Sequence, residues 1–232
     1  MVKDALIKIT CWLNENANRI TKYSLNSGAT EDDLNKLSSV TKYLPPDFKD
    51  LYRTYNGEND NENWGNFFYG LLFLSIDDIL NDINFRLQQP NNISLRKADE
   101  GIDPTSIFNA NWIGIGSDGS RSSLRVDLAP TAAGIYGQVI YIDGDEQIAF
   151  VVARSLGQLL QQFAFDLHNG MYILNTEALE DGQHFIEPKQ EIDLAYWKMI
   201  DRWKHAYNKT LERNWGLTEK ISTFCAITSI CK

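Results

Sequence analysis

Acidic side chains gather in two short stretches of the chain that could attract a cation or a basic partner. Each stretch lies beside a glycine and between apolar segments: Glu58, Asp60 and Glu62 in the first, and Asp143, Asp145 and Glu146 in the second. Neither has the D-x-D-x-D-G run, with a glutamate at the twelfth position, that is typical of a calcium loop. Turns select aspartate and asparagine whatever their function. Two interpretations therefore stay open: solvated turns, or a negative patch that meets a cationic partner.

A glycine-rich segment, Gly114–Gly119, matches the G-x-G-x-x-G pattern of dinucleotide-binding loops. That function requires a helix directly after the glycines, because the helix N-terminus binds the pyrophosphate. Residues 120–126 instead alternate as a strand does, and the chain lacks the other motifs of a protein kinase. We therefore predict a hairpin turn here and expect no cofactor.

The residues that usually bind metals or act as nucleophiles show no productive spacing. His168, His184 and His205 are far apart, and the three cysteines show no C-x-x-C pair. The G-x-S-x-G pattern of serine hydrolases is absent as well. The sequence thus predicts neither a metal site nor catalytic activity, although an enzyme with an unrecognised site stays an alternative.

The overall charge argues against a nucleic-acid partner. The 31 acidic and 22 basic residues give a net charge of −9, and no run of lysines and arginines offsets it. Lys3, Asp4 and Lys8 interrupt the apolar stretch that a signal peptide would need, and no apolar run approaches the length of a membrane span. We therefore expect a cytoplasmic protein without membrane contact.

The elements that must position these residues follow from the apolar periodicity. Helical stripes cover residues 6–20, 30–40, 46–55, 76–87, 155–170 and 193–215, and short β-rich runs cover residues 69–74, 111–115, 123–128, 137–142 and 147–152. Tight turns between the later runs require antiparallel pairing. We predict an α+β fold with a central antiparallel sheet flanked by helices. Its expected buried core includes Phe48, Leu51, Trp112, Leu160 and Phe163.

The order of the motifs resembles the SUKH superfamily, named partly after fungal cell-wall regulators of the Smi/Knr type. The resemblance rests on these pieces, in sequence order: Leu44-Pro45-Pro46 before a helix that leads to Asn56-Gly57, an apolar strand, Trp112 ahead of the glycine-rich turn, Asp127-Leu128-Ala129-Pro130, a strand from Gly137, and a helix opened by Ser155. It covers residues 30–174.

Residues 175–232 lie outside the resemblance, and from the apolar periodicity we predict that they form a helical C-terminal extension packed on the domain. The resemblance implies that this domain spans residues 1–174. It also implies structural roles rather than catalytic ones for three residues of the pattern. Trp112 should anchor the core beneath the sheet, and Gly137 should permit a close backbone approach. Asp127 should accept hydrogen bonds from backbone N–H groups of the following turn.

The resemblance implies a function in binding, because bacterial members of the superfamily are mostly immunity proteins. Our first hypothesis is therefore a non-catalytic immunity protein that neutralises a toxin domain of a bacterial polymorphic toxin system. The two acidic stretches would then bind a basic toxin domain, such as a nuclease. The alternative is a regulatory scaffold of the fungal cell-wall type, for which long disordered flanks would be expected.

Overall fold

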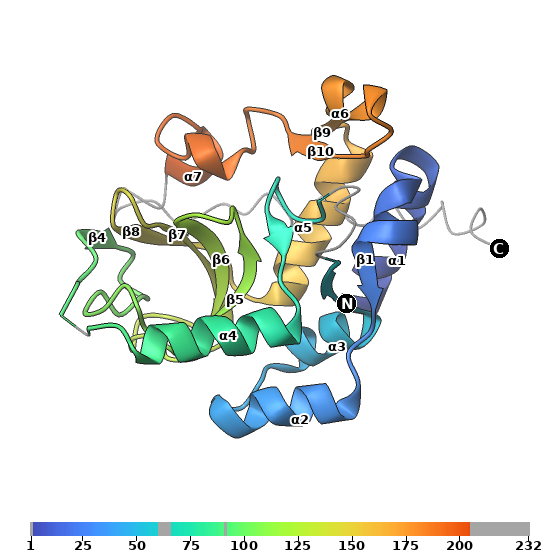
Figure 1. Ribbon diagram of the computed structural model, residues 1–232. Coiled ribbons are helices and arrows are strands. Elements are labelled where there is room, and N and C mark those ends of the chain that lie inside the picture. The colour runs from blue at the N-terminus through green and yellow to red at the C-terminus, as the bar shows by residue number, and fades with distance from the viewer. Residues whose placement is uncertain (1, 60–65, 91, 205–232) are drawn as a thin grey trace.

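The computed structural model describes residues 2–59, 66–90 and 92–204, which fold around a sheet of six strands in the order β3-β5-β6-β7-β8-β4 (Figure 1). The central four strands form an antiparallel meander: β5 (Trp112–Ser117), β6 (Ser122–Asp127), β7 (Gln138–Asp143) and β8 (Ile148–Ala153). At the edges, β3 (Leu72–Phe73) runs antiparallel to β5 and β4 (Lys97–Ala98) runs parallel to β8. The predicted α+β fold is confirmed, and β4 adds a short parallel pair that was not expected.

Helices surround this sheet, and local sequence signals set the start of several of them. The longer ones are α1 (Val2–Asn16), α2 (Glu31–Val40), α3 (Pro46–Thr54), α4 (Ile76–Leu87) and α5 (Leu156–His168). Thr30 with Asp33, and Ser75 with Asp78, form capping boxes at the starts of α2 and α4. Ser155 caps α5, and Gly170 ends it in a left-handed conformation with φ of 66°.

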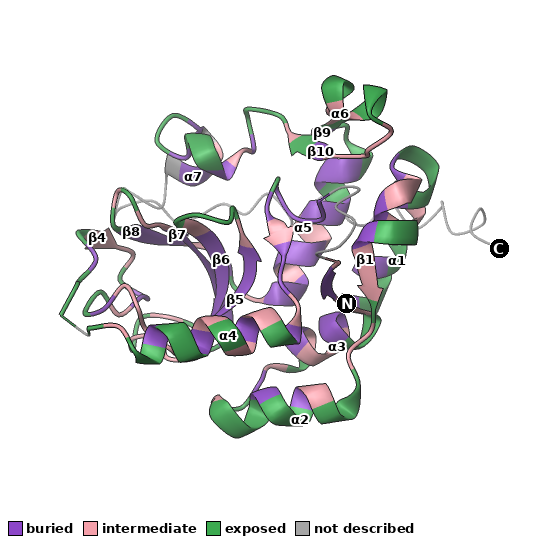
Figure 2. Ribbon diagram, viewed as in Figure 1, coloured by how far each residue is buried: buried purple, intermediate pink, exposed green. Residues whose placement is uncertain are grey.

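The buried apolar side chains form two separate clusters, so the core has two parts. Figure 2 shows that the strands of the sheet are largely buried. Phe48, Leu51, Leu160 and Phe163 pack in the larger part, to which α1, α3 and α5 contribute. Trp112 lies in the smaller part, with Ile102 and Ile140 among its neighbours. All five residues expected in the core are fully or almost fully buried, as predicted.

Backbone turns shorten two of the expected elements. The strand expected over residues 69–74 is reduced to β3, because Tyr69 and Gly70 both have positive φ, at 40° and 76°, and so turn the chain. The helix over residues 46–55 ends at Thr54 and continues directly into β2 (Tyr55–Glu58). Gly57 lies within β2 and has a left-handed backbone conformation, with φ of 75°. A Cβ at this position would lie 2.3 Å from the Ser75 nitrogen.

The first expected helix is also shorter than its apolar stripe. It breaks after Asn16, and a π-helix (Ile20–Ser24) leads into β1 (Leu25–Ser27), which pairs with β2. No helix among the described residues has the length and apolar composition needed to cross a bilayer.

The described part of the C-terminal extension does not form the continuous helix expected from residue 193. It contains α6 (Thr176–Glu180), β10 (Ile186–Pro188) paired with β9 (Tyr172–Leu174), a 3-10 helix (Leu194–Tyr196) and α7 (Asp201–Lys204). The remainder of that prediction, residues 205–215, lies outside the described residues. Trp197 and Trp203 are buried in the larger core. Their apolar spacing therefore reflects packing of this segment on the domain and not one face of a continuous helix.

Candidate functional site

Glu58 does not lie in an exposed loop, and that part of the expectation is wrong. Its side chain is only 3% exposed, because β2 turns it inward beside β3. The Glu58 carboxylate accepts a hydrogen bond from the Phe73 backbone N–H at 2.7 Å, and burial raises its pKa to about 8. It therefore cannot touch a partner in this fold. Asp60 and Glu62 lie outside the described residues.

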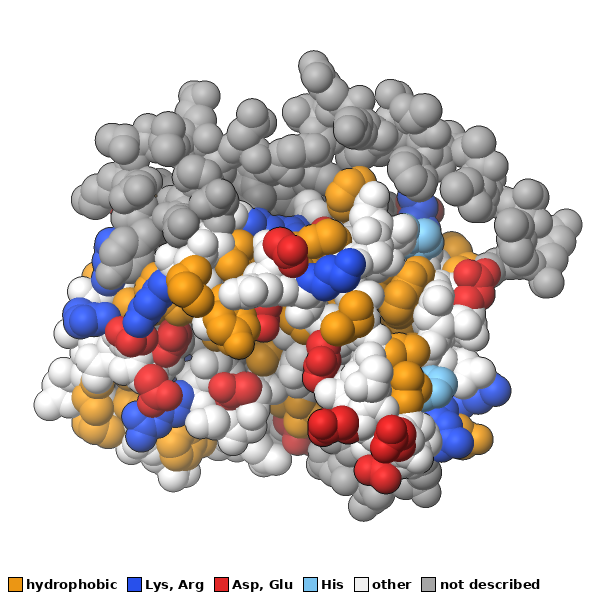
Figure 3. All heavy atoms as spheres, turned by 90° about the horizontal axis from the view of Figure 1, so that it is seen from above, with side chains coloured by type: hydrophobic (Ala, Val, Ile, Leu, Met, Phe, Trp, Pro, Cys, Tyr) orange, Lys and Arg blue, Asp and Glu red, His pale blue; other side chains and the backbone are white. Residues whose placement is uncertain are grey.

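The second acidic stretch does form one cluster, at the turn between β7 and β8. Its carboxylates are paired within the chain: Asp145 with Arg121 at 3.1 Å, and Glu146 with Arg96 at 2.6 Å and with Lys198 at 2.5 Å. The hydrogen bond from Lys198 is the main cause that lowers the pKa of Glu146. Figure 3 shows basic side chains interleaved with acidic ones on this side of the molecule. A role for Asp143, Asp145 and Glu146 in binding a separate partner stays a prediction.

Most of the glycine-rich segment, residues 114–117, belongs to strand β5, and the predicted hairpin turn to β6 occupies residues 118–121. The Asp118 carboxylate holds this turn by accepting hydrogen bonds from the backbone N–H groups of Ser120 and Ser122.

The two histidines that the structure describes form hydrogen bonds with backbone groups: His168 with the Ala164 carbonyl, and His184 with the Arg19 N–H. Nowhere in residues 2–59, 66–90 and 92–204 do three or more His, Cys, Asp or Glu side chains gather as metal ligands do.

A buried polar network joins α4 to the sheet. Asp82 on α4 bridges two arginines: Arg125 of β6 at 2.6 Å and Arg86 at 3.0 Å. Burial alone would raise the pKa of Asp82, but the two guanidinium groups hold it below its ordinary value. Both arginines are mostly buried and also donate to backbone carbonyls, at Trp112 and Ile107. This network therefore joins α4 to β6 and to backbone carbonyls of neighbouring segments.

The connection from β6 to β7, residues 128–137, is held rigidly at both ends. Asp127 accepts hydrogen bonds from the Ala129 N–H at 2.8 Å and from the Gln138 side chain at 3.0 Å, as predicted for its role in the turn. Gly137 has φ of 81°, and a Cβ there would lie 2.9 Å from Pro45, which confirms the predicted close approach. The connection is thereby pressed against the Leu44-Pro45-Pro46 segment ahead of α3.

This contact exposes three large apolar side chains side by side. Tyr43 is 68% exposed, Ile135 48% and Tyr136 44%. The Tyr136 hydroxyl donates to the Tyr43 backbone carbonyl at 2.5 Å, which joins the β6–β7 connection to the segment ahead of α3. The Lys49 ammonium lies 5.2 Å from the centroid of the Tyr43 ring. We call Tyr43, Ile135 and Tyr136 the Tyr43 face.

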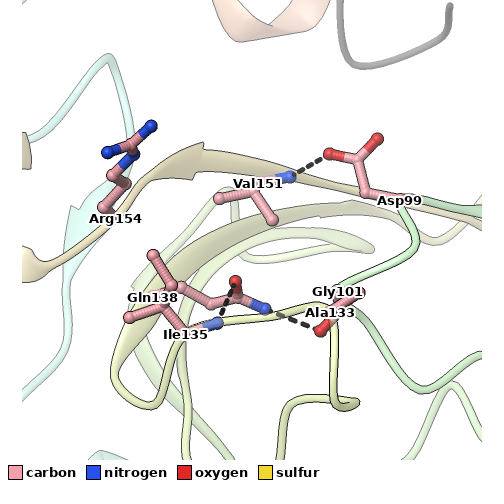
Figure 4. Close-up of a pocket in the computed structure, with 7 residues that line it drawn as sticks. All are labelled: Asp99, Gly101, Ala133, Ile135, Gln138, Val151 and Arg154. Carbon is pink, nitrogen blue, oxygen red and sulfur yellow. Dashed lines mark hydrogen bonds between the residues drawn. The ribbon is translucent and has the colours of Figure 1, made fainter. Parts of the chain in front are cut away.

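A shallow pocket of about 310 Å³ continues the Tyr43 face beyond Ile135 (Figure 4). Its lining is Asp99, Gly101, Ala133, Ile135, Gln138, Val151 and Arg154. Asp99 and Arg154 flank Val151 on either side, and Ile135 and Gln138 form the opposite wall (Figure 4). Asp99 accepts the Val151 N–H at 2.9 Å, whereas Arg154 is exposed and forms no salt bridge within the described part of the chain.

The pocket lining contains no Ser, Cys, Lys or His, so it lacks the Ser–His and Cys–His pairs that many nucleophilic enzymes use. Exposed aromatic rings with an arginine nearby, here Arg154, are of the kinds enriched in surfaces that bind another protein.

Sequence reasoning missed Tyr43, Ile135, Tyr136, Asp99 and Arg154. Their spacing carries no signal, because they come from segments far apart in the chain. The sequence did contain one indication of this site, because Pro45 and Gly137 both belong to the motifs on which the family resemblance rests. Their contact is what brings Tyr43 next to Tyr136.

A family model and several known proteins match the sequence of this chain. The model of the SMI1 / KNR4 family (SUKH-1) matches residues 28–162, which include the Tyr43 face and the pocket. "Cell wall biosynthesis/cell cycle regulator smi1" of Schizosaccharomyces pombe is 24% identical over 228 residues, 91% of this chain and 44% of that protein. "Glucan synthesis regulatory protein" of Neurospora crassa is 29% identical over 124 residues, 50% of this chain and 23% of that protein.

A "KNR4/SMI1 homolog" of Kluyveromyces lactis is 39% identical over 70 residues, which are 30% of this chain and 13% of that protein. The chain thus spans less than half the length of each of these relatives.

Proposed function

This chain belongs to the SMI1 / KNR4 family (SUKH-1), and from that premise we propose that it is a regulatory binding protein that docks on another protein through the Tyr43 face. The observation that carries the proposal is the exposed pair of tyrosines, joined by the hydrogen bond from the Tyr136 hydroxyl to the Tyr43 backbone, beside Ile135 and a pocket. Such aromatic anchors contribute most of the energy at protein interfaces. Binding then needs no chemistry from this chain.

The names of the relatives support a regulatory role in the synthesis of the cell wall. Two of them are described as regulators of cell-wall biosynthesis and of glucan synthesis. The alternative of a cell-wall type regulator is therefore better supported than toxin immunity. The paired carboxylates of the β7–β8 turn also offer a basic toxin less free negative charge than the sequence indicated.

The proposal is tested by exchange of the related regions. This chain replaces the aligned region within the Schizosaccharomyces pombe regulator, and the chimera is expressed in cells that lack that regulator. We expect the chimera to restore the cell-wall glucan content. The same chimera with Ile135→Asp and Tyr136→Ala should fail, while Leu87→Ala, at a more exposed apolar site on α4, should not matter.

A chimera that is expressed and folded but leaves the glucan content of the wall unchanged would contradict the regulatory role. Equal rescue by the chimera with Ile135→Asp and Tyr136→Ala would remove the Tyr43 face from that role.

A further inference from the structure

The last described segment of the chain, residues 189–204, runs across the molecule after β10 and joins none of its sheets (Figure 1). We call it the strap. Its first residue, Lys189, donates a backbone hydrogen bond to Met171. The backbone hydrogen bonds that follow are internal to the strap within the described residues, such as Trp197 to Leu194 and Trp203 to Ile200. The strap is therefore attached to the core through its side chains, as a bound peptide would be.

Two tryptophans of the strap provide the apolar part of this attachment. The ring of Trp197 lies 5.8 Å from that of Phe150, and the ring of Trp203 lies 6.3 Å from Phe150 and 6.5 Å from Tyr69. Both tryptophans are almost completely buried, at 3% and 4% exposure. Large aromatic side chains dominate the energetics of cores and interfaces alike.

Three polar contacts between the strap and the core share the same direction. In each one, a donor of the strap meets a carboxylate of the core: Trp197 with Asp143 at 3.0 Å, Lys198 with Glu146 at 2.5 Å, and Arg202 with Asp166 at 2.7 Å. The acidic cluster at the β7–β8 turn thus already binds a basic, aromatic segment. That segment comes from the same chain.

The core side of this contact requires a cation. Asp166 on α5 is 2% exposed, and without Arg202 it would be left as a buried carboxylate with only Gln162 beside it. The hydroxyl groups of Tyr69 and Tyr172 are also buried there and have no hydrogen-bond partner in the described structure. A partner segment with cations and further donors would satisfy these groups.

We propose that the strap is an intramolecular ligand, and that the face beneath it is a second interaction surface for a partner segment of the same chemistry. We call this the strap face and define it by Tyr69, Asp143, Glu146, Phe150 and Asp166. The partner segment carries two aromatic residues six positions apart with a Lys or Arg next to each, as in Trp197-Lys198 and Arg202-Trp203. This surface is independent of the Tyr43 face and goes beyond the function proposed above.

The strap competes with a partner segment because it is covalently attached to the chain that carries the strap face. A tethered ligand has an effective concentration in the millimolar range, so it excludes free segments of similar affinity. Weakening the strap should open the face, since the apparent dissociation constant of a partner is divided by the fraction of open molecules.

The test uses the full chain and a fluorescent synthetic peptide of residues 189–204 as the probe. Lys198→Glu and Arg202→Glu together remove the two cations of the strap but leave the strap face intact. We expect this variant to bind the peptide at least about tenfold more tightly than the parent. A peptide with both tryptophans changed to alanine should not bind, and a chain with Lys8→Glu and Lys22→Glu, two exposed sites elsewhere, should behave as the parent.

Two results would overturn the proposal. One is a folded double variant that binds the peptide no better than the parent. The other is loss of cooperative unfolding in both the double variant and Lys198→Glu alone, whose side chain is 55% exposed. The strap would then be an inseparable part of the core.

Discussion

Glu58 holds its carboxyl group in a nearly dry site between β2 and β3, and this makes stability depend on pH. Its pKa is about 8 in the folded chain against 4.5 for the ordinary group. The stability that the protonated Glu58 carboxyl contributes is therefore fully present below pH 4.5 and is lost as the pH rises through about 8. The reason is that, as the pH rises, the unfolded chain releases this proton before the folded chain does. Each pKa unit corresponds to about 1.4 kcal/mol, so the loss amounts to several kcal/mol.

Glu58→Gln should remove this loss, because the amide oxygen can still accept the Phe73 N–H without carrying a charge. The measurement is urea unfolding across the interval from pH 4.5 to about 8 for parent and variant. Glu180→Gln, at an exposed glutamate of α6, serves as the control. A variant that loses stability with pH as steeply as the parent would show that Glu58 does not titrate in this way.

Trp112 fills the smaller part of the core and has no exposed surface. Trp112→Ala should therefore lower the free energy of unfolding by about 3–5 kcal/mol, through lost burial and the cavity left behind. Tyr43→Ala, at an exposed ring, should change it by less than about 0.5 kcal/mol. Urea unfolding of both variants measures the difference. Comparable values for the two would mean that Trp112 does not anchor the core.

At the scale of elements, α4 depends on the charged network that joins it to β6. Asp82→Asn would leave Arg125 and Arg86 buried without an ionised partner, which costs about 3–5 kcal/mol. Asp77→Asn, at an exposed site in the first turn of the same helix, should cost less than about 1 kcal/mol. Thermal or urea unfolding compares the two variants. If Asp82→Asn were as mild as Asp77→Asn, the network would not carry the attachment of α4.

Elements defined by local chemistry could be predicted from the sequence, and those defined by distant contacts could not. The capping boxes at Thr30 and Ser75 fixed the starts of α2 and α4. The short parallel pairing of β4 with β8 was missed, because a two-residue strand has no periodicity. The stripe of Trp197, Ile200 and Trp203 was read as one helix, although its burial comes from docking on Phe150 and Tyr69.

The residues of the candidate site could not be predicted from the sequence for the same reason. Acidic residues are visible in a sequence, but their partners are not, so Glu58 and Glu146 looked equally exposed. One is buried beside β3, and the other is paired with Arg96 and Lys198. The Tyr43 face arises only when Pro45 meets Gly137, which no local pattern states.

At the scale of the whole molecule, the net charge of −9 is not concentrated in an unpaired patch at the β7–β8 turn. The turn binds the strap, and the Tyr43 face lies at another part of the domain with Lys49 and Arg154 as its cations. The molecule thus presents two separable surfaces. One, the Tyr43 face, is exposed, and the other, the strap face, is covered by the strap.

The claim that this protein acts by binding through the Tyr43 face is tested most directly by photocrosslinking in its native cell. A photoreactive amino acid is placed at position 136 and, as a control, at Leu87, which is 68% exposed on α4. We predict one dominant adduct with a cellular protein from position 136, abolished by Ile135→Asp, and none from position 87. The same adducts from both positions, or no adduct from position 136, would contradict the account.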